Sequence, residues 1–268
     1  MSGYVGVRSV AKKIDKLYVG DGAGTARAVQ KAYVGDPRGV AKLWYQLGTP
    51  LGGLAVGSSV YFKVNNVRTE WLVVQHGNPD ASIYDSSCNG TWLLMKNIYE
   101  SRKWHSSNTN DYANSTIHSY LNSTFLGLLE TGVRSAVKQV KLPYRKGSGT
   151  SKIVTSGSNG LSAKIFLLSA TETSFSFSYM PSGEGAELAY FKGCADNSSD
   201  PKRVAYHNGS AAGWWLRSPY CNGSSNPLYV NSKGDWHYNY CSYSLGIRPC
   251  LILPKSALTD DNNNVIGG

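Results

Sequence analysis

The sequence has few charged residues, only 16% of the chain, and it lacks the cysteine and histidine spacings of a metal site. Its five cysteines are an odd number without a Cys-x-x-Cys pair, so neither a disulfide framework nor a zinc or redox site is indicated. The five histidines form no His-x-x-x-His pair, and no Gly-x-Ser-x-Gly elbow or Walker loop occurs. These absences argue against hydrolases and nucleotide-binding proteins, and we expect a protein that is not an enzyme and needs no cofactor.

Long apolar runs are also missing. No stretch approaches the roughly 20 apolar residues of a membrane span, and the first residues lack the apolar core of a secretory signal. We therefore expect synthesis in a cytoplasm without Sec export and no membrane insertion. Six Asn-x-Ser/Thr triplets are then a by-product of an Asn/Ser-rich composition.

What the chain has is positive charge, formally +10, and residues 1–46 supply half of it with eight Lys or Arg against three Asp. Such a segment suits an anionic glycan, a nucleic acid or an acidic protein, and it equally suits a solvated face that keeps the chain soluble. We do not expect nucleic acid to be the partner.

The same segment contains a repeat. Tyr4-Val5-Gly6, Tyr18-Val19-Gly20 and Tyr33-Val34-Gly35 recur every 14 to 15 residues, each followed by a basic stretch. A unit this short supplies a strand and a turn but cannot bury a core alone. Residues 1–47 are thus predicted to be a small β-repeat segment that docks on another body or oligomerises.

A second domain, residues 48–268, is predicted to follow a linker at 46–54. Alternating apolar residues predict a β-hairpin, and an N-cap near Asn114 with helical spacing predicts the first helix. The order of elements favours an α+β fold with short strands, two or three helices and long loops. The expected hairpin strands are 59–64 and 69–74, the helices 114–121, 124–130 and 185–191, and the further strands 136–142, 164–168, 214–218, 228–230 and 247–253.

The last part of this domain has an unusual composition. Residues 220–244 contain five Tyr, five Ser and four Asn among 25 positions, and only Lys233 and Asp235 are charged. Antibody paratopes share this composition, because Tyr offers a rigid amphipathic contact area while Ser, Asn and Gly adapt their hydrogen bonding. The alternative is a simple loop whose tyrosines cover a core.

An extended backbone at 236–242 would place Trp236, Tyr238, Tyr240 and Ser242 on one face, opposite His237, Asn239 and Cys241. One of these faces should then be exposed. For the paired tryptophans at 214 and 215, and for Leu216, we expect packing in the core rather than contact with a ligand.

Two motifs, Gly213-Trp-Trp-Leu-Arg-Ser-Pro219 and Gly246-Ile-Arg-Pro-Cys-Leu-Ile-Leu253, flank a loop-rich stretch with Gly234. Together they resemble a family of C-type-lectin-like domains, with a formylglycine-generating-enzyme-like fold, from gut bacteria and their phages. The resemblance covers roughly residues 48–255. Some members of that family are variable proteins of diversity-generating retroelements, in which adenines, chiefly in Asn codons, are changed within a C-terminal ligand-binding segment.

The resemblance implies a ligand- or receptor-binding protein with a variable segment at about 214–248. Its partner would be a host-surface protein or glycan, and residues 1–47 would attach it to a virion or to copies of itself. It would be made in the bacterial cytoplasm and act at the virion surface. The expected contact residues are Tyr220, Asn222, Ser224, Asn226, Tyr229, Asn231, Asp235, His237, Tyr238, Asn239, Tyr240, Ser242 and Tyr243.

Residue types that can arise from an Asn codon by changing adenines (Tyr, Ser, Asn, Asp, His and Cys) fill 18 of the 25 positions. Lys233 and Trp236 cannot arise that way, so we expect them to be fixed. Arg217 and Arg248 are expected to hold loops through hydrogen bonds to carbonyl oxygens.

Two other functions stay open. One is an oxidase of the formylglycine-generating type that would use Cys241 and Cys250, although Cys250 lies in an apolar strand where an inert thiol is expected. The other is a structural virion or cell-surface module that does not vary. A structural calcium ion is conceivable at the oxygen-rich loop 196–200.

Overall fold

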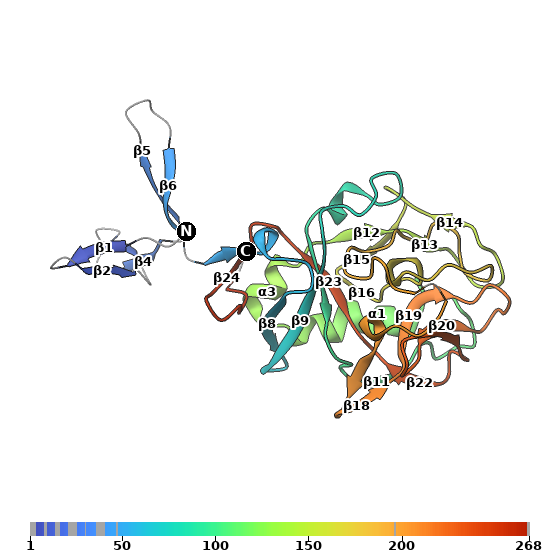
Figure 1. Cartoon of the computed structure of the whole chain (residues 1–268). Coiled ribbons are helices and arrows are strands. Elements are labelled where there is room, and N and C mark those ends of the chain that lie inside the picture. Colours follow the sequence, from blue (N-terminus) through green and yellow to red (C-terminus); the bar gives the residue numbers. More distant parts are fainter. Residues whose placement is uncertain are drawn as a thin grey trace.

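The computed structural model describes residues 4–7, 10–13, 17–20, 26–29, 31–35, 41–46, 48–195 and 197–266. In the first part of the chain, each Tyr-Val-Gly repeat contributes one strand of an antiparallel hairpin (Figure 1). A repeat is thus a pair of strands, where the sequence indicated one strand and a turn. The pairs are β1 (Tyr4–Val7) with β2 (Val10–Lys13), β3 (Tyr18–Gly20) with β4 (Ala26–Ala28), and β5 (Lys31–Gly35) with β6 (Ala41–Gln46).

From residue 48 onward the chain mixes helices with many short strands, so the predicted α+β class is confirmed. Two five-stranded sheets organise it. The first, sheet 1, has the order β16 (Ile165–Phe166), β23 (Cys250–Leu253), β10 (Thr91–Met95), β9 (Val67–His76) and β8 (Ser59–Val64). The second, sheet 2, has the order β11 (Ser101–Lys103), β22 (Ser244–Gly246), β19 (Trp214–Pro219), β20 (Pro227–Val230) and β21 (Trp236–Tyr238).

Smaller elements surround these sheets. The two-stranded ladders are β7 (Thr49–Pro50) with β24 (Leu258–Thr259), β12 (Val140–Leu142) with β15 (Leu161–Ala163), β13 (Tyr144–Arg145) with β14 (Val154–Thr155), and β17 (Ala205–His207) with β18 (Ser210–Ala212). Single 3-10 turns occur at η1 (Leu51–Gly53), η2 (Ser86–Cys88), η4 (Thr171–Thr173) and η5 (Pro201–Arg203). Within the described residues, none of the helices has the length and apolar character needed to cross a membrane.

The hairpin of β8 and β9 forms as predicted, with β9 starting two residues earlier than expected. Its turn consists of Asn65 and Asn66, whose φ angles of +49° and +63° fit the tight turns that match strand twist. The strand expected at 247–253 is shorter in the structure, where β23 covers only Cys250–Leu253. Pro249 has no N–H to donate, and strand pairing begins at Cys250.

The first predicted helix is present as α1 (Thr116–Tyr120), and the Ser115 hydroxyl caps it by accepting from the His118 N–H. The chain then continues through a π-helical turn, η3 (Leu121–Phe125), into α2 (Leu126–Leu128), and α3 (Thr131–Ala136) follows. The second predicted helix therefore overlaps η3 and α2 rather than forming one separate helix.

The third predicted helix, at residues 185–191, is wrong. The Leu188 N–H donates to the Glu172 carbonyl and the Tyr190 N–H donates to the Val74 carbonyl. Gly185 has a φ of +150° and lies so close to Tyr84 that a side chain would not fit. Apolar spacing suggested a helix, but the backbone of this segment is hydrogen-bonded to other parts of the fold instead.

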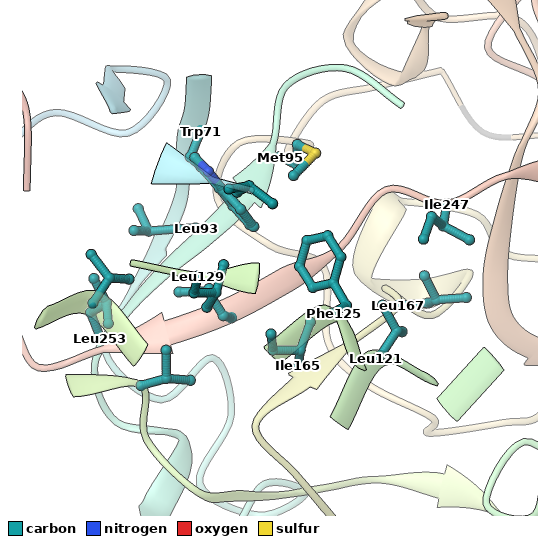
Figure 2. Packing of buried hydrophobic residues seen from close by; sticks show 14 of the residues in the cluster. Trp71, Leu93, Met95, Leu121, Phe125, Leu129, Ile165, Leu167, Ile247 and Leu253 are labelled. Carbon is teal, nitrogen blue, oxygen red and sulfur yellow. The ribbon is translucent and has the colours of Figure 1, made fainter. Parts of the chain in front are cut away.

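Sheet 1 has core on both faces. Leu93 and Met95 of β10 belong to one hydrophobic cluster, and Trp92 and Leu94 belong to the other. Figure 2 shows the first cluster, in which side chains from β9 and β10 meet Phe125 from the helical segment. Since both faces are covered, this sheet is a fixed support for the rest of the domain.

Candidate recognition surface

The predicted contact residues lie on sheet 2 and its loops. β19 is the central strand, and all six of its residues are buried, which confirms that Trp214, Trp215 and Leu216 pack in the core. β20 and β21 continue the sheet outward to an edge. None of the thirteen predicted contacts is buried: Asn222, Ser224, His237, Tyr238, Tyr240, Ser242 and Tyr243 are exposed, and Tyr220, Asn226, Tyr229, Asn231, Asp235 and Asn239 are half-buried.

The structure brings several of these side chains together. The Tyr220 and Tyr238 rings stack with centroids 4.1 Å apart and an interplanar angle of 2°. Tyr229 and His237 lie 5.5 Å apart on the other face of the β20–β21 ladder, and further along the chain Tyr240 and Tyr243 form a looser pair. Tyr238, Tyr240 and Tyr243 are therefore exposed, whereas Tyr220 and Tyr229 are half-buried and also pack against the hydrophobic clusters beneath them.

The side chains of two predicted contacts, Asn231 and Asp235, form hydrogen bonds within a turn. The Asn231 side chain accepts from the N–H groups of Lys233 and Asp235, and the Asp235 carboxylate accepts from the Trp236 N–H. Gly234 completes this turn with a φ of +84°, and a side chain there would meet the Asp200 carbonyl. Asn231 and Asp235 thus shape the connection between β20 and β21.

The extended backbone expected over 236–242 exists only in its first part. β21 ends at Tyr238, and Cys241 is buried instead of lying on an exposed face. The Cys241 N–H donates to the Ser225 carbonyl, and the Cys241 carbonyl accepts from the Trp104 N–H. These bonds hold Cys241 inside the fold, whereas His237 and Tyr238, at the end of β21, are both exposed.

Buried residues from outside the segment hold its loops. Asn110 is fully buried, its N–H donates to the Ser224 carbonyl and its amide donates to the Gly223 carbonyl. Its side-chain oxygen accepts from Arg145 at 2.7 Å and from the Gly149 N–H at 2.9 Å. The Asn110 side chain therefore fixes the loops of Gly149 and Gly223 to each other. Loops that are already ordered lose less conformational entropy when a ligand binds.

The two arginines of the motifs make the hydrogen bonds that we expected. Arg217 is fully buried and donates to the carbonyls of Leu167 and Glu184 and, through two bonds of 2.5 and 2.7 Å, to the Glu172 carboxylate. Arg248 donates to the Met95 carbonyl at 2.9 Å. Both lie in the scaffold beneath the aromatic surface.

All five cysteines are free and buried. Burial raises the pKa of Cys241 to about 12 and that of Cys221 to about 11, and it raises the pKa of Cys250 well above its ordinary value. Because the thiolate is the reactive form, these thiols are poor nucleophiles near neutral pH. The conceivable calcium loop includes Asp196, which lies outside the described residues, and Asp200 in this loop caps η5 by accepting from the Lys202 N–H.

A family model described as a domain of unknown function, DUF6273, matches residues 89–255. The chain belongs to this family. No curated protein and no solved structure matches the chain. The DUF6273 region contains all thirteen predicted contacts together with Asn110 and the three buried residues Cys221, Arg217 and Arg248, whereas the β8–β9 hairpin and the N-terminal repeats lie before it.

Within the DUF6273 region, sequence reasoning missed part of the aromatic surface. Phe177 stacks on Trp236 with ring centroids 4.0 Å apart, and Tyr179, 45% exposed, lies edge-on to Tyr220 at 5.5 Å. Both come from a loop some forty residues before the predicted segment. The alternation of aromatic residues and serines at 175–179, which resembles the composition at 220–244, is the signal that could have indicated them.

Proposed function

We propose that this chain is a binding protein and not an enzyme, and that residues 214–248 display a variable recognition surface on a C-type-lectin-like scaffold. The observation that carries the proposal is that exposed contact residues and buried supporting residues occur side by side in one segment. All thirteen predicted contacts reach solvent, while Trp214, Arg217, Cys221 and Cys241 between and beside them are buried. Side chains can therefore change at the surface while the supporting residues stay the same.

The chemistry of the surface supports a binding role. Tyrosine rings contribute large contact areas with few rotatable bonds, and a few such aromatic anchors usually supply most of the affinity of an interface. The high pKa values of Cys241 and Cys250 weigh against an oxidase that needs a reactive cysteine pair. The assignment to the C-type-lectin-like fold rests on the two motifs of the resemblance, which form the buried strands β19 and β23 in the two sheets.

The proposed partner is a protein or glycan on a host surface, and the proposed location is the surface of a virion assembled in a bacterial cytoplasm. The three N-terminal hairpins would then serve attachment to the virion or association between copies of the chain. This arrangement separates anchoring in residues 1–47 from recognition in residues 214–248.

The DNA around the gene tests the proposal. We expect a near-copy of the segment encoding residues 214–248 that differs only at adenines, beside a gene for a reverse transcriptase. Sibling sequences should vary at the contacts other than Asn231 and Asp235, whose side chains shape the β20–β21 turn. They should stay constant at Cys221 and Cys241, although both cysteines can arise from Asn codons, because these two are buried. Siblings that are invariant at the exposed tyrosines would indicate a structural module instead.

A further inference from the structure

A groove lies against the aromatic surface, outside the segment proposed to vary. It encloses about 320 Å³ and is lined by residues 175–178 and 180–183 together with Lys152 and Thr171. Phe177 belongs to both features, since it lines the groove and stacks on Trp236. The groove and the aromatic surface are therefore continuous.

Cys221 connects both walls of the groove to the proposed variable segment. Its N–H donates to the Tyr179 carbonyl at 2.6 Å, which holds the loop that carries Phe177. Its thiol contacts the Ser151 carbonyl at 3.4 Å, next to Lys152. Because Cys221 is buried and bonded on both sides, the groove has a fixed position relative to Tyr220 and Tyr238.

The lining has a definite chemical character. Lys152 is exposed, no carboxylate lines the groove, and none of the ion pairs among the described residues involves Lys152. Hydroxyl groups of Ser176, Ser178 and Ser182 accompany this cation, and Phe175 and Met180 are buried apolar residues of the lining. The chain from residue 131 to residue 171 contains no Asp or Glu at all, so the loop of Lys152 lacks a nearby acid in sequence.

We propose that this groove is a fixed subsite of the recognition surface that takes an acidic side chain of a protein partner. The carboxylate would accept hydrogen bonds from the Lys152 ammonium and the serine hydroxyls, and the aliphatic stem would lie on the apolar part of the lining. We take the occupant to be a polypeptide, because an acidic side chain carries both the carboxylate and the aliphatic stem that this lining suits. Next to the groove, Trp236 and Tyr220 have rings stacked on both sides and offer a sugar ring no free face.

This inference rests on the proposed function, and one experiment separates the two. The full chain is used to select binders from a random peptide library displayed on yeast. We expect selected peptides to carry an Asp or Glu near an aromatic or aliphatic residue, and to lose affinity when Tyr238 is replaced by Ser. The affinity of a selected peptide should fall roughly tenfold with Lys152→Glu and less than about twofold with Lys146→Glu.

Lys146 is the matched control, because it is exposed in the same loop, does not line the groove and gives the same change in net charge. Replacing the peptide's acid by its amide should lower affinity for the natural chain and should leave unchanged or raise affinity for Lys152→Glu, because there the acid faces a like charge. Peptides that depend on Tyr238 but respond equally to the two lysine variants would overturn the subsite and leave the recognition surface standing. If no selected peptide depends on Tyr238, the proposed function fails and the subsite fails with it.

Discussion

At the scale of the residue, Arg217 shows how the scaffold is held beneath its surface. Its guanidinium is fully buried with the Glu172 carboxylate, so removing it leaves a buried charge without compensation. We expect Arg217→Ala to lower the free energy of unfolding by about 3 to 5 kcal/mol, measured by urea denaturation.

Lys96→Ala is the matched control, since it removes an ion pair to Glu70 in which the lysine side chain is 46% exposed. Lys96→Ala should lower the free energy of unfolding by less than about 1 kcal/mol, because water screens an exposed ion pair. Equal losses in the two variants would contradict the structural role of Arg217.

Glu184 gives the scaffold a pH dependence. Burial raises the pKa of Glu184 above its ordinary value of 4.5, although Arg217 partly offsets this. The folded chain therefore binds a proton that the unfolded chain releases, so this group's contribution to stability is present below about pH 4.5 and is lost as the pH rises through the folded-state pKa.

Glu184→Gln should remove this loss, because the amide oxygen can still accept from the Arg145 N–H, which lies 3.2 Å from the carboxylate. We expect the variant to gain stability relative to the natural chain as the pH rises above 4.5, measured as the difference in unfolding free energy over a pH series. A difference that stays constant or declines with rising pH would show that the pKa of Glu184 is not raised in the folded chain.

At the scale of the element, α1 depends on its cap. The buried Ser115 hydroxyl accepts from the His118 N–H and donates to the Tyr112 carbonyl. Ser115→Ala removes the partner of the His118 N–H, whereas the Tyr112 carbonyl still accepts from the Ser115 N–H. We expect a loss of about 1 to 2 kcal/mol in thermal or chemical unfolding. Ser119→Ala, in an exposed position of the same helix, should be neutral or slightly stabilising, and a comparable loss there would show that the cap is not the cause.

Elements with local signals could be predicted from the sequence, and those fixed by distant contacts could not. The β8–β9 hairpin and the capped start of α1 follow from alternation and a capping residue within a few positions. The segment at 185–191 has helical spacing as well, yet its N–H groups bond to Glu172 and Val74, far away in the chain. Local spacing carries no information about such partners.

At the scale of the whole molecule, the same limit applies to the recognition surface. Composition favoured accessible tyrosines at 220–244 but left open that they cover a core, and Tyr220 and Tyr229 do pack in part against the core. It could not predict that Cys241 turns inward, or that Phe177 and Tyr179 contact Trp236 and Tyr220. Those positions depend on hydrogen bonds and ring contacts between segments that are distant in sequence.

A recognition surface whose side chains can vary requires a domain whose stability does not depend on its exposed tyrosines. The unfolding free energy of the triple variant Tyr238→Ser, Tyr240→Ser and Tyr243→Ser tests this directly, with Tyr112→Ser as the same substitution at a tyrosine that is 1% exposed. We predict a loss of about 1 kcal/mol for the triple variant, mainly from the stacking of Tyr238 on Tyr220, and a loss of about 3 kcal/mol or more for Tyr112→Ser. A triple variant that is destabilised as strongly as Tyr112→Ser would show that these tyrosines serve packing, and it would contradict the account.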